Sequence, residues 1–196
     1  MEQIFFIIIF LYSVIAHEVA HGKMAEYLGD PTARLAGRLT LNPLAHIDPI
    51  GSVLLPLLLF SAGSPILFGW AKPVPYNPYN LGNYRYANAL VAGAGVGTNL
   101  AIAIIFGIFI RLLVLPEVLA SFFAQIVLLN LVLGVFNLVP IPPLDGSKIL
   151  FDFLGDTQLT RWLERYGVIL LVIFIVFGFS YLTPLIEFFY AVIVGY

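Results

Sequence analysis

The sequence lacks cysteine entirely and carries few charges, and both shortages exclude whole classes of protein. Without a thiol, the chain has no disulfide, no thiolate zinc ligand and no cysteine nucleophile. Only 10% of the 196 residues are charged, against about 25% in an ordinary globular protein. The net charge of −2 argues against a nucleic-acid partner. What remains is 61% hydrophobic residues, too many for a soluble core and its shell, so the composition indicates a polytopic membrane protein.

Long apolar runs divide the chain and predict its membrane segments. A full crossing needs roughly 20 apolar residues. We therefore expect an all-α polytopic membrane protein with about four to six membrane segments, built as a single domain over residues 1–196. The first run lacks the positive region and cleavage site of a signal peptide, so it is expected to stay as a membrane helix. The runs lie at 4–22, 50–69, 88–115, 118–138 and 166–183.

Polar and proline-rich stretches separate these runs. The first helix is expected to end at Leu28, where Gly29-Asp30-Pro31 supplies a C-cap and a stop. Residues 32–48 predict a short β element followed by a turn, and Asp48-Pro49 predicts the cap and first turn of the next helix. Proline-rich residues 69–84 cannot form a regular helix. Residues 136–150 predict a membrane helix that breaks and restarts.

The stretch "HEVAH" places three ionisable groups in the first membrane segment. His17 and His21 are four residues apart and would share one face of a helix. This spacing provides two imidazole nitrogens for Zn²⁺, and Glu18 provides a carboxylate that can take a proton from the attacking water. A pair of buried polar residues is the simpler alternative. Ionisable groups at membrane depth are costly, however, and they usually mark function.

A catalytic zinc site needs a third protein ligand. Glu26 sits at a helix end, while Asp48 and His46 fit a cap and a turn. Asp145 follows a proline-broken helix in an apolar context, where a solvated-surface role does not fit easily. The full set of candidates is Glu26, His46, Asp48, Asp145, Asp152 and Asp156.

Three motifs in this order give the chain a resemblance to the site-2 protease family of intramembrane zinc metalloproteases (peptidase family M50). They are "HEVAH", then "AGAGVGTN", then "NLVPIPPLDG". Two further stretches, "NPLAHIDPIGSVLLP" and "FGWAKPVPYNP", resemble the minimal subgroup without a PDZ or CBS domain. The resemblance covers about residues 10–150.

The resemblance implies a role for each matching residue. It makes Asp145 the third ligand of one Zn²⁺ per chain, beside His17 and His21, and Glu18 the general base. It also implies that Asn137 orders the unwound segment. The family's G-P-x-x-N motif matches with Val96 where proline is usual, and its asparagine, Asn99, could donate to the developing oxyanion. The glycines around it, at 93, 95 and 97, also favour close helix packing.

The nine basic residues predict the topology. If 50–69 is a simple crossing, they divide four against five. If 50–86 enters and returns, as a re-entrant or extended membrane-embedded stretch, only Arg111 lies opposite the other eight. The positive-inside rule favours the second arrangement. It also brings the His pair and Asp145 to the same side, so we expect a multi-pass protein of the cell membrane with its active site toward the cytoplasm.

The expected function is an intramembrane zinc endopeptidase that acts in regulated intramembrane proteolysis. Its partners would be transmembrane protein substrates and the lipid bilayer, with no nucleic acid. An extended stretch at 72–80 could pair with the substrate as an added strand. The alternative is a metal-binding membrane transporter or scaffold, since transporters also use broken helices at mid-membrane.

Overall fold

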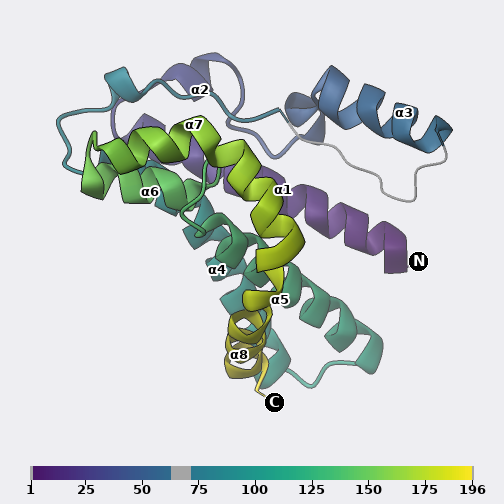
Figure 1. Ribbon diagram of the computed structural model, residues 1–196. Coiled ribbons are helices and arrows are strands. Elements are labelled where there is room, and N and C mark those ends of the chain that lie inside the picture. Colours follow the sequence, from purple (N-terminus) through teal and green to yellow (C-terminus); the bar gives the residue numbers. More distant parts are fainter. Residues whose placement is uncertain (1, 63–71, 196) are drawn as a thin grey trace.

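Four helices in the described part of the chain are long and apolar enough to cross a membrane (Figure 1). The computed structural model describes residues 2–62 and 72–195. The first three spans are α1 (Glu2–Tyr27), α4 (Ala87–Leu112) and α5 (Glu117–Asn137). The fourth is α7 (Gln158–Ile173), which η4 (Phe174–Gly178) and η5 (Phe179–Tyr181) continue. The number of spans lies within the range that the sequence predicts.

Many apolar side chains of these spans lie on the outside. On the last span, Val168, Val176 and Phe177 are each more than 60% exposed. A water-soluble monomer rarely exposes so large an apolar patch, but lipid tails can cover it. Because lipid is as apolar as leucine, small and polar residues rather than large apolar ones must define the inside of such a bundle.

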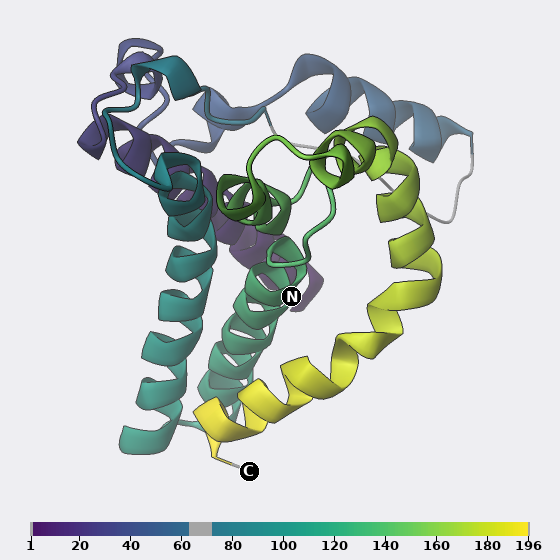
Figure 2. The same cartoon turned by 60° about the vertical axis from the view of Figure 1, so that its left-hand side comes forward.

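The inner packing is formed mainly by α4 and α5, which run side by side (Figure 2). α1 packs against α4, and α8 (Thr183–Val194) contacts both α4 and α5. A cluster of buried apolar side chains joins α4, α5 and α8: Ala103, Val127, Leu131, Val135, Ile186 and Val194.

The segment between α1 and α4 leaves the helix bundle and returns to it at the same end. α1 ends at Tyr27, and Gly29 takes a positive φ of 111°, as the predicted C-cap requires. Farther along, the Gly82 N–H donates to the Leu28 carbonyl at 2.8 Å. The C-terminal end of α1 and the N-terminal end of α4 therefore lie at the same end of the bundle.

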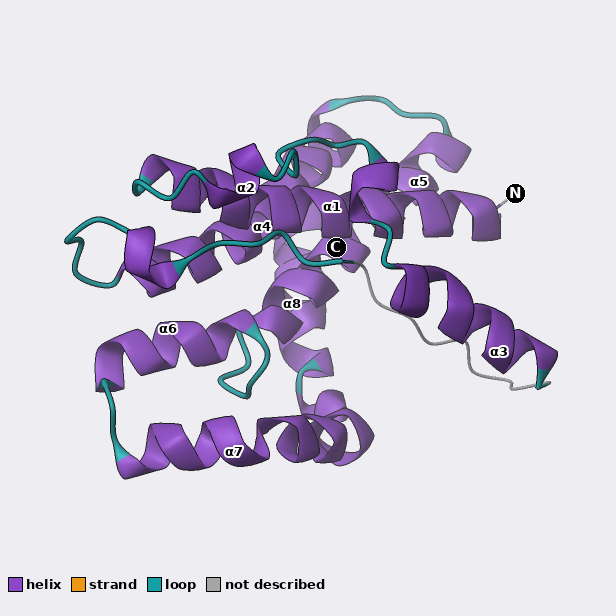
Figure 3. Ribbon diagram, turned by 90° about the horizontal axis from the view of Figure 1, so that it is seen from above, coloured by secondary structure: helices purple, strands orange, loops and turns teal. Residues whose placement is uncertain are grey.

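The predicted β element after the first helix is wrong. No strand occurs at 2–62 or 72–195, and residues 32–48 hold two short helical turns (Figure 3). These are α2 (Thr32–Leu35) and η1 (Pro43–His46). The side chain of Asp30 accepts from the Thr32 N–H and so favours a helical turn. The side chain of Asn42 accepts from the Leu44 N–H in the same way.

The next elements follow the predicted capping. Asp48 accepts from the N–H groups of Ile50 and Gly51 at the start of η2 (Pro49–Leu54), a π-helical turn that leads into α3 (Leu55–Ser61). The predicted re-entry at 50–86 falls in part on 63–71, outside the described residues. Beyond them the chain is extended from Lys72 and turns at η3 (Pro78–Asn80).

The proline-broken stretch after α5 restarts as predicted. α5 ends at Asn137, and α6 (Asp145–Leu154) begins eight residues later and runs antiparallel to α7 (Figure 3). The side chain of Asp152 on α6 accepts from the Ala89 N–H and the Asn88 amide. These bonds satisfy part of the exposed N-terminus of α4 and fix α6 beside it. The start of α6 is thereby brought to the level of the His pair.

Candidate metal centre

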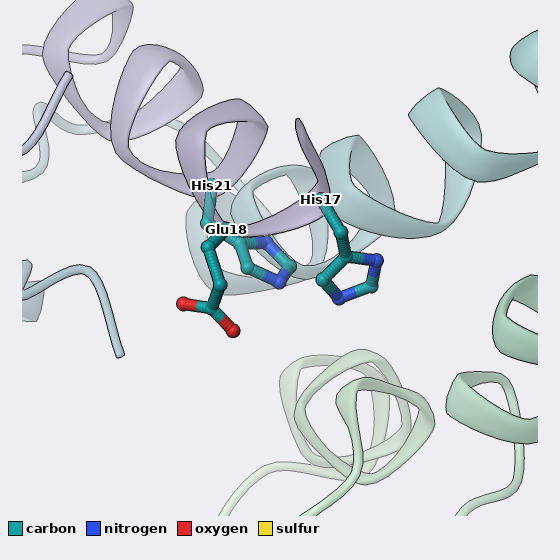
Figure 4. Close-up of side chains that lie close together, drawn as sticks. All are labelled: His17, Glu18 and His21. Atoms are coloured by element: carbon teal, nitrogen blue, oxygen red, sulfur yellow. The ribbon is translucent and has the colours of Figure 1, made fainter. Parts of the chain in front are cut away.

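Three ionisable side chains of α1 point into the same space. His17, Glu18 and His21 offer ligand atoms that all lie within 4.8 Å of one another (Figure 4). The two imidazole rings meet edge to face, with centroids 4.5 Å apart. Only 7% of His17 and 6% of His21 is exposed. The helical spacing thus brings the three side chains together.

Asp145 completes this cluster from the first residue of α6. One of its oxygens, Oδ2, lies 2.9 Å from Nε2 of His17 and 3.1 Å from Nε2 of His21. Only 4% of Asp145 is exposed. His17 and Asp145 are 128 positions apart in the chain, yet the fold brings both imidazoles and one carboxylate oxygen of Asp145 together.

The second nitrogen of each imidazole has an acceptor. Nδ1 of His21 lies 2.8 Å from the Val91 carbonyl oxygen, which can only accept. Nδ1 of His17 lies 2.6 Å from Oδ1 of Asn99. If both Nδ1 atoms donate, both Nε2 lone pairs face the same carboxylate oxygen. Three lone pairs converging in a buried site need a cation between them, and nitrogen and oxygen ligands suit Zn²⁺.

One stripe of α4 supports both imidazoles. Val91, Gly95 and Asn99 are spaced four residues apart, so they lie on one face of the helix. A Cβ on Gly95 would lie 2.6 Å from Nε2 of His21 and 2.8 Å from Cε1 of His17. Glycine is therefore the residue that lets the rings reach α4, with an acceptor for His21 on one side and an acceptor for His17 on the other.

Glu18 is oriented by the extended proline-rich segment. Its Oε2 accepts from the Val74 N–H at 2.9 Å. Within Pro73-Val74-Pro75, only Val74 has an N–H to give. A Cβ on Gly22 would lie 2.7 Å from the Val74 side chain, so this glycine allows the segment to approach α1.

The same segment is held at both ends. Arg38 donates from Nη2 to the Lys72 carbonyl at 2.6 Å. At the other end, the fully buried Asp30 accepts from the Asn77 N–H at 2.6 Å and the Asn80 amide at 2.9 Å. Burial alone would raise the pKa of Asp30, but the hydrogen bonds from Thr32, Asn77 and Asn80 outweigh it and hold this pKa below its usual value.

A cavity of about 250 Å³ opens beside the cluster, large enough for several waters or a short peptide segment. Sequence reasoning missed one of its side chains, Lys148, whereas Tyr76 lies in the 72–80 stretch that was expected to face the substrate. Lys148 donates to Oδ1 of Asp145 at 3.0 Å, and its Nζ lies 6.0 Å from the centre of the Tyr76 ring. Burial raises the pKa of Tyr76. The cavity is lined by His17, Glu18, His21, Pro73, Val74, Tyr76, Asn137, Pro143, Asp145 and Lys148.

The two predicted asparagines occupy different places. Asn99 is fully buried, and its Nδ2 donates to Oδ1 of Asn130 at 2.9 Å and to the Ser13 carbonyl at 3.4 Å. Asn137 lines the cavity, and its Nδ2 donates to the Leu133 carbonyl at 2.9 Å, within α5. Asn99 thus contacts a histidine of the cluster, whereas Asn137 faces the space beside it.

The other candidate third ligands lie outside the cavity and contact other groups. Glu26 pairs with Lys23 and Arg34, and Asp156 pairs with Arg161. Nε2 of the buried His46 lies 2.8 Å from the Thr40 carbonyl. Asp48 caps η2 and Asp152 caps α4, as described above.

Comparison with known proteins gives a consistent set of relatives. The model of "Peptidase family M50" matches residues 114–180, which include Asn137 and Asp145 but not the His pair. "Putative zinc metalloprotease YwhC" of Bacillus subtilis is 40% identical over 193 residues, covering 92% of this chain and 81% of the relative.

More distant relatives carry a similar name. "Putative zinc metalloprotease Rip2" of Mycobacterium tuberculosis is 36% identical over 142 residues, covering 71% of this chain and 53% of the relative. Its namesake in Mycolicibacterium smegmatis is 31% identical over 172 residues, covering 85% of this chain and 64% of the relative. The chain thus spans only part of the Rip2 proteins. No solved structure matches it. The chain belongs to peptidase family M50: it is a zinc metalloprotease of the site-2 protease type and a multi-pass membrane protein.

Proposed function

We propose that this zinc metalloprotease cleaves the transmembrane segments of other membrane proteins. The observation that carries the proposal is the convergence of both His Nε2 atoms on one oxygen of Asp145, beside a carboxylate and an open cavity, among membrane-spanning helices. A transporter or scaffold, the alternative function, is not favoured by membership in a protease family.

In this proposal His17, His21 and Asp145 hold one Zn²⁺ per chain. Their three ligand atoms face one another from two helices, and each has a second contact that orients it. Bound zinc supplies a Lewis acid, which polarises the scissile carbonyl and makes water nucleophilic near neutral pH. Lys148 holds the other oxygen of Asp145, so that Oδ2 is left to face the imidazoles.

Glu18 acts as the general base. It takes a proton from the attacking water and passes that proton to the leaving amine. The Val74 N–H contacts Oε2 and thereby fixes the direction of the carboxylate. Asn99 acts as a positioning residue for His17, because its amide nitrogen already has two acceptors. Asn137, which lines the cavity, is better placed to face the substrate.

A cleavage assay in detergent with single-pass membrane substrates tests this function. Glu18→Gln should retain zinc but cut at least about 100-fold more slowly, the usual range for loss of a general base. Wild-type cleavage that survives removal of zinc, or undiminished cleavage by Glu18→Gln, would refute the mechanism.

Zinc content tests the ligand set separately from cleavage. Asp145→Ala should lose most of its zinc after dialysis against a chelator, whereas Asp48→Ala should keep it and only lose stability, because Asp48 is a helix cap. Zinc that leaves Asp48→Ala but stays in Asp145→Ala would show that the third ligand is misassigned.

We also propose that the active site faces the cytoplasm. Lys23, near the end of α1, and Arg85, just before α4, lie at the end of the bundle where Leu28 and Gly82 meet, while Arg111 lies at the other end of α4. The positive-inside rule supports this orientation. Since the chain has no cysteine of its own, single cysteines give a clean test. Cysteine at Gly155 should react with impermeant reagents from the cytoplasm, and cysteine at Pro116 from the opposite side only.

A further inference from the structure

A chain of polar side chains crosses the interior of the bundle behind the metal centre. Asn99 on α4 and Asn130 on α5 are both 0% exposed, and Ser13 on α1 is 5% exposed. Unpaired amides at membrane depth would each be costly, so their contacts must account for them. This hydrogen-bonded network begins at His17 on α1 and returns to α1 at Ser13, one helical turn away.

Every polar atom of the two amides has a partner. Nδ2 of Asn130 donates to Oγ of Ser13 at 3.0 Å and to the Ile126 carbonyl at 2.9 Å. Oδ1 of Asn130 accepts from Nδ2 of Asn99 at 2.9 Å. Oδ1 of Asn99 is then the atom that faces Nδ1 of His17, at 2.6 Å.

A backbone carbonyl fixes the donor-to-acceptor direction of the hydrogen bonds in this network. The Ser13 hydroxyl can donate or accept, but the Ile126 carbonyl can only accept. The amide nitrogen of Asn130 must therefore face Ile126, and its oxygen must face Asn99. Asn99 in turn presents its nitrogen to Asn130 and its oxygen to His17; the longer contact to the Ser13 carbonyl acts in the same sense. Only a protonated Nδ1 on His17 satisfies that oxygen.

We infer that Asn130 is a positioning residue, which sets the tautomer of His17 through Asn99 and so keeps Nε2 free for the metal. His21 needs no such relay, because a backbone carbonyl already contacts its Nδ1. The inference rests on the proposed metal site and deepens it: a residue of α5 that does not contact the cluster would control one of its ligands.

Three variants separate this role from ordinary helix packing. Asn130→Leu removes both amide atoms, so Asn99 can turn over and His17 can take either tautomer. Ser13→Ala removes one hydrogen bond but leaves the Ile126 carbonyl, so the direction of the chain survives. Val127→Ala, at a fully buried apolar site on the same helix, controls for lost packing. Asn130→Ala serves if the leucine variant does not fold, since it also removes both amide atoms.

Two measurements on purified protein decide the matter. Competition with a chelator should show zinc held about tenfold more weakly by Asn130→Leu, as expected for loss of an outer partner of a ligand. Ser13→Ala and Val127→Ala should stay within about threefold of wild type. Nitrogen-15 NMR of zinc-loaded protein labelled at its three histidines should show His17 with a protonated Nδ1 and a metal-bound Nε2 in wild type, and a mixture of bound nitrogens in Asn130→Leu.

The outcomes distinguish this inference from the proposed function. A wild-type protein that binds no zinc would refute the metal site itself. A wild type that binds zinc, with Asn130→Leu equal to it in affinity and tautomer, would overturn the relay alone. Equal weakening in Asn130→Leu and Val127→Ala would overturn it too, because packing would then be sufficient.

Discussion

Replacing Gly95 with alanine should remove zinc without unfolding the protein. The new Cβ would lie 2.6 Å from Nε2 of His21 and 2.8 Å from Cε1 of His17, where ordinary contact begins at 3.4 Å. The His17 ring would therefore have to retreat by 0.6 Å, and the His21 ring by more than 0.8 Å because its Cε1 lies closer still. Zinc–ligand distances tolerate only about 0.2 Å. We expect a loss of zinc affinity on the order of 100-fold, comparable to other displacements near 1 Å in active sites.

The same helix provides matched controls. Gly93 and Gly97 flank Gly95 on α4, and a Cβ at either would meet nothing within 4 Å. Each glycine-to-alanine change also gains about 1 kcal/mol of helix propensity. Gly93→Ala and Gly97→Ala should therefore keep wild-type zinc affinity and melt at the same temperature or slightly higher.

The assay is chelator competition on detergent-purified protein, with thermal melting alongside. Gly95→Ala should melt within a few degrees of wild type in the metal-free state, yet bind zinc far more weakly. If it binds zinc as wild type does, the imidazoles are not pressed against α4 as the structure has them. Equal zinc loss in the Gly93 and Gly97 variants would also refute the reasoning, because small-residue packing of α4 would then be the cause.

Three further predictions concern the groups around the site. Folding lowers the pKa of Asp30, so the stability that Asp30 contributes is present above the unfolded pKa of about 3.9 and is lost as pH falls through the folded value. Asp30→Asn should therefore lower the melting temperature at pH 7 by the equivalent of about 2 kcal/mol, and the difference in melting temperature from wild type should narrow below pH 4. The same change at the exposed Asp156 should have little effect. Lys148→Met should weaken zinc about tenfold in chelator competition, because Oδ1 of Asp145 loses its donor; unchanged affinity would refute that contact. Val74→Pro removes the N–H that Glu18 accepts and should depress cleavage with zinc retained, whereas Val74→Ala keeps the N–H and should cleave faster than Val74→Pro; equal rates would refute the orienting role.

The sequence predicts the parts of the site that depend on side-chain spacing. His17 and His21 share a helix face because helical geometry dictates it. Its apolar surroundings set Asp145 apart from the other candidates, and the resemblance to the site-2 protease family implied it as the third ligand. The structure brings it to the same point as the His pair. Asp48 caps its turn as its position before Pro49 predicts. In each case the deciding information lies within a few residues of the chain.

The parts that sequence reasoning missed depend on backbone groups and on distant partners. The Val91 carbonyl and the Val74 N–H carry no side-chain signal, although they orient His21 and Glu18. Asn130 did carry a signal, since an asparagine within "VLLNLVLG" is costly at membrane depth. Lys148 carried one too, three residues after Asp145 and hence on the same helix face.

The predicted β element failed for a related physical reason. Residues 32–48 were expected to form a short strand, but a strand needs a partner, and none of the described segments offers a free edge there. Local capping by Asp30 and Asn42 supplies hydrogen bonds that a sheet would otherwise have supplied. Short polar segments between membrane helices are therefore decided by side-chain caps more than by strand propensity.

The proline-rich segment links the base, the substrate and the fold. Pro73 and Pro75 leave Val74 as the single N–H donor at that point, and Glu18 uses it. A substrate that pairs with this segment as an added strand would have to bond to its remaining groups, because Arg38 already occupies the Lys72 carbonyl. Pairing and orientation of the base therefore involve the same few residues. A substrate that shifts the segment must also shift Glu18, so correct docking and a correctly aimed carboxylate would be coupled.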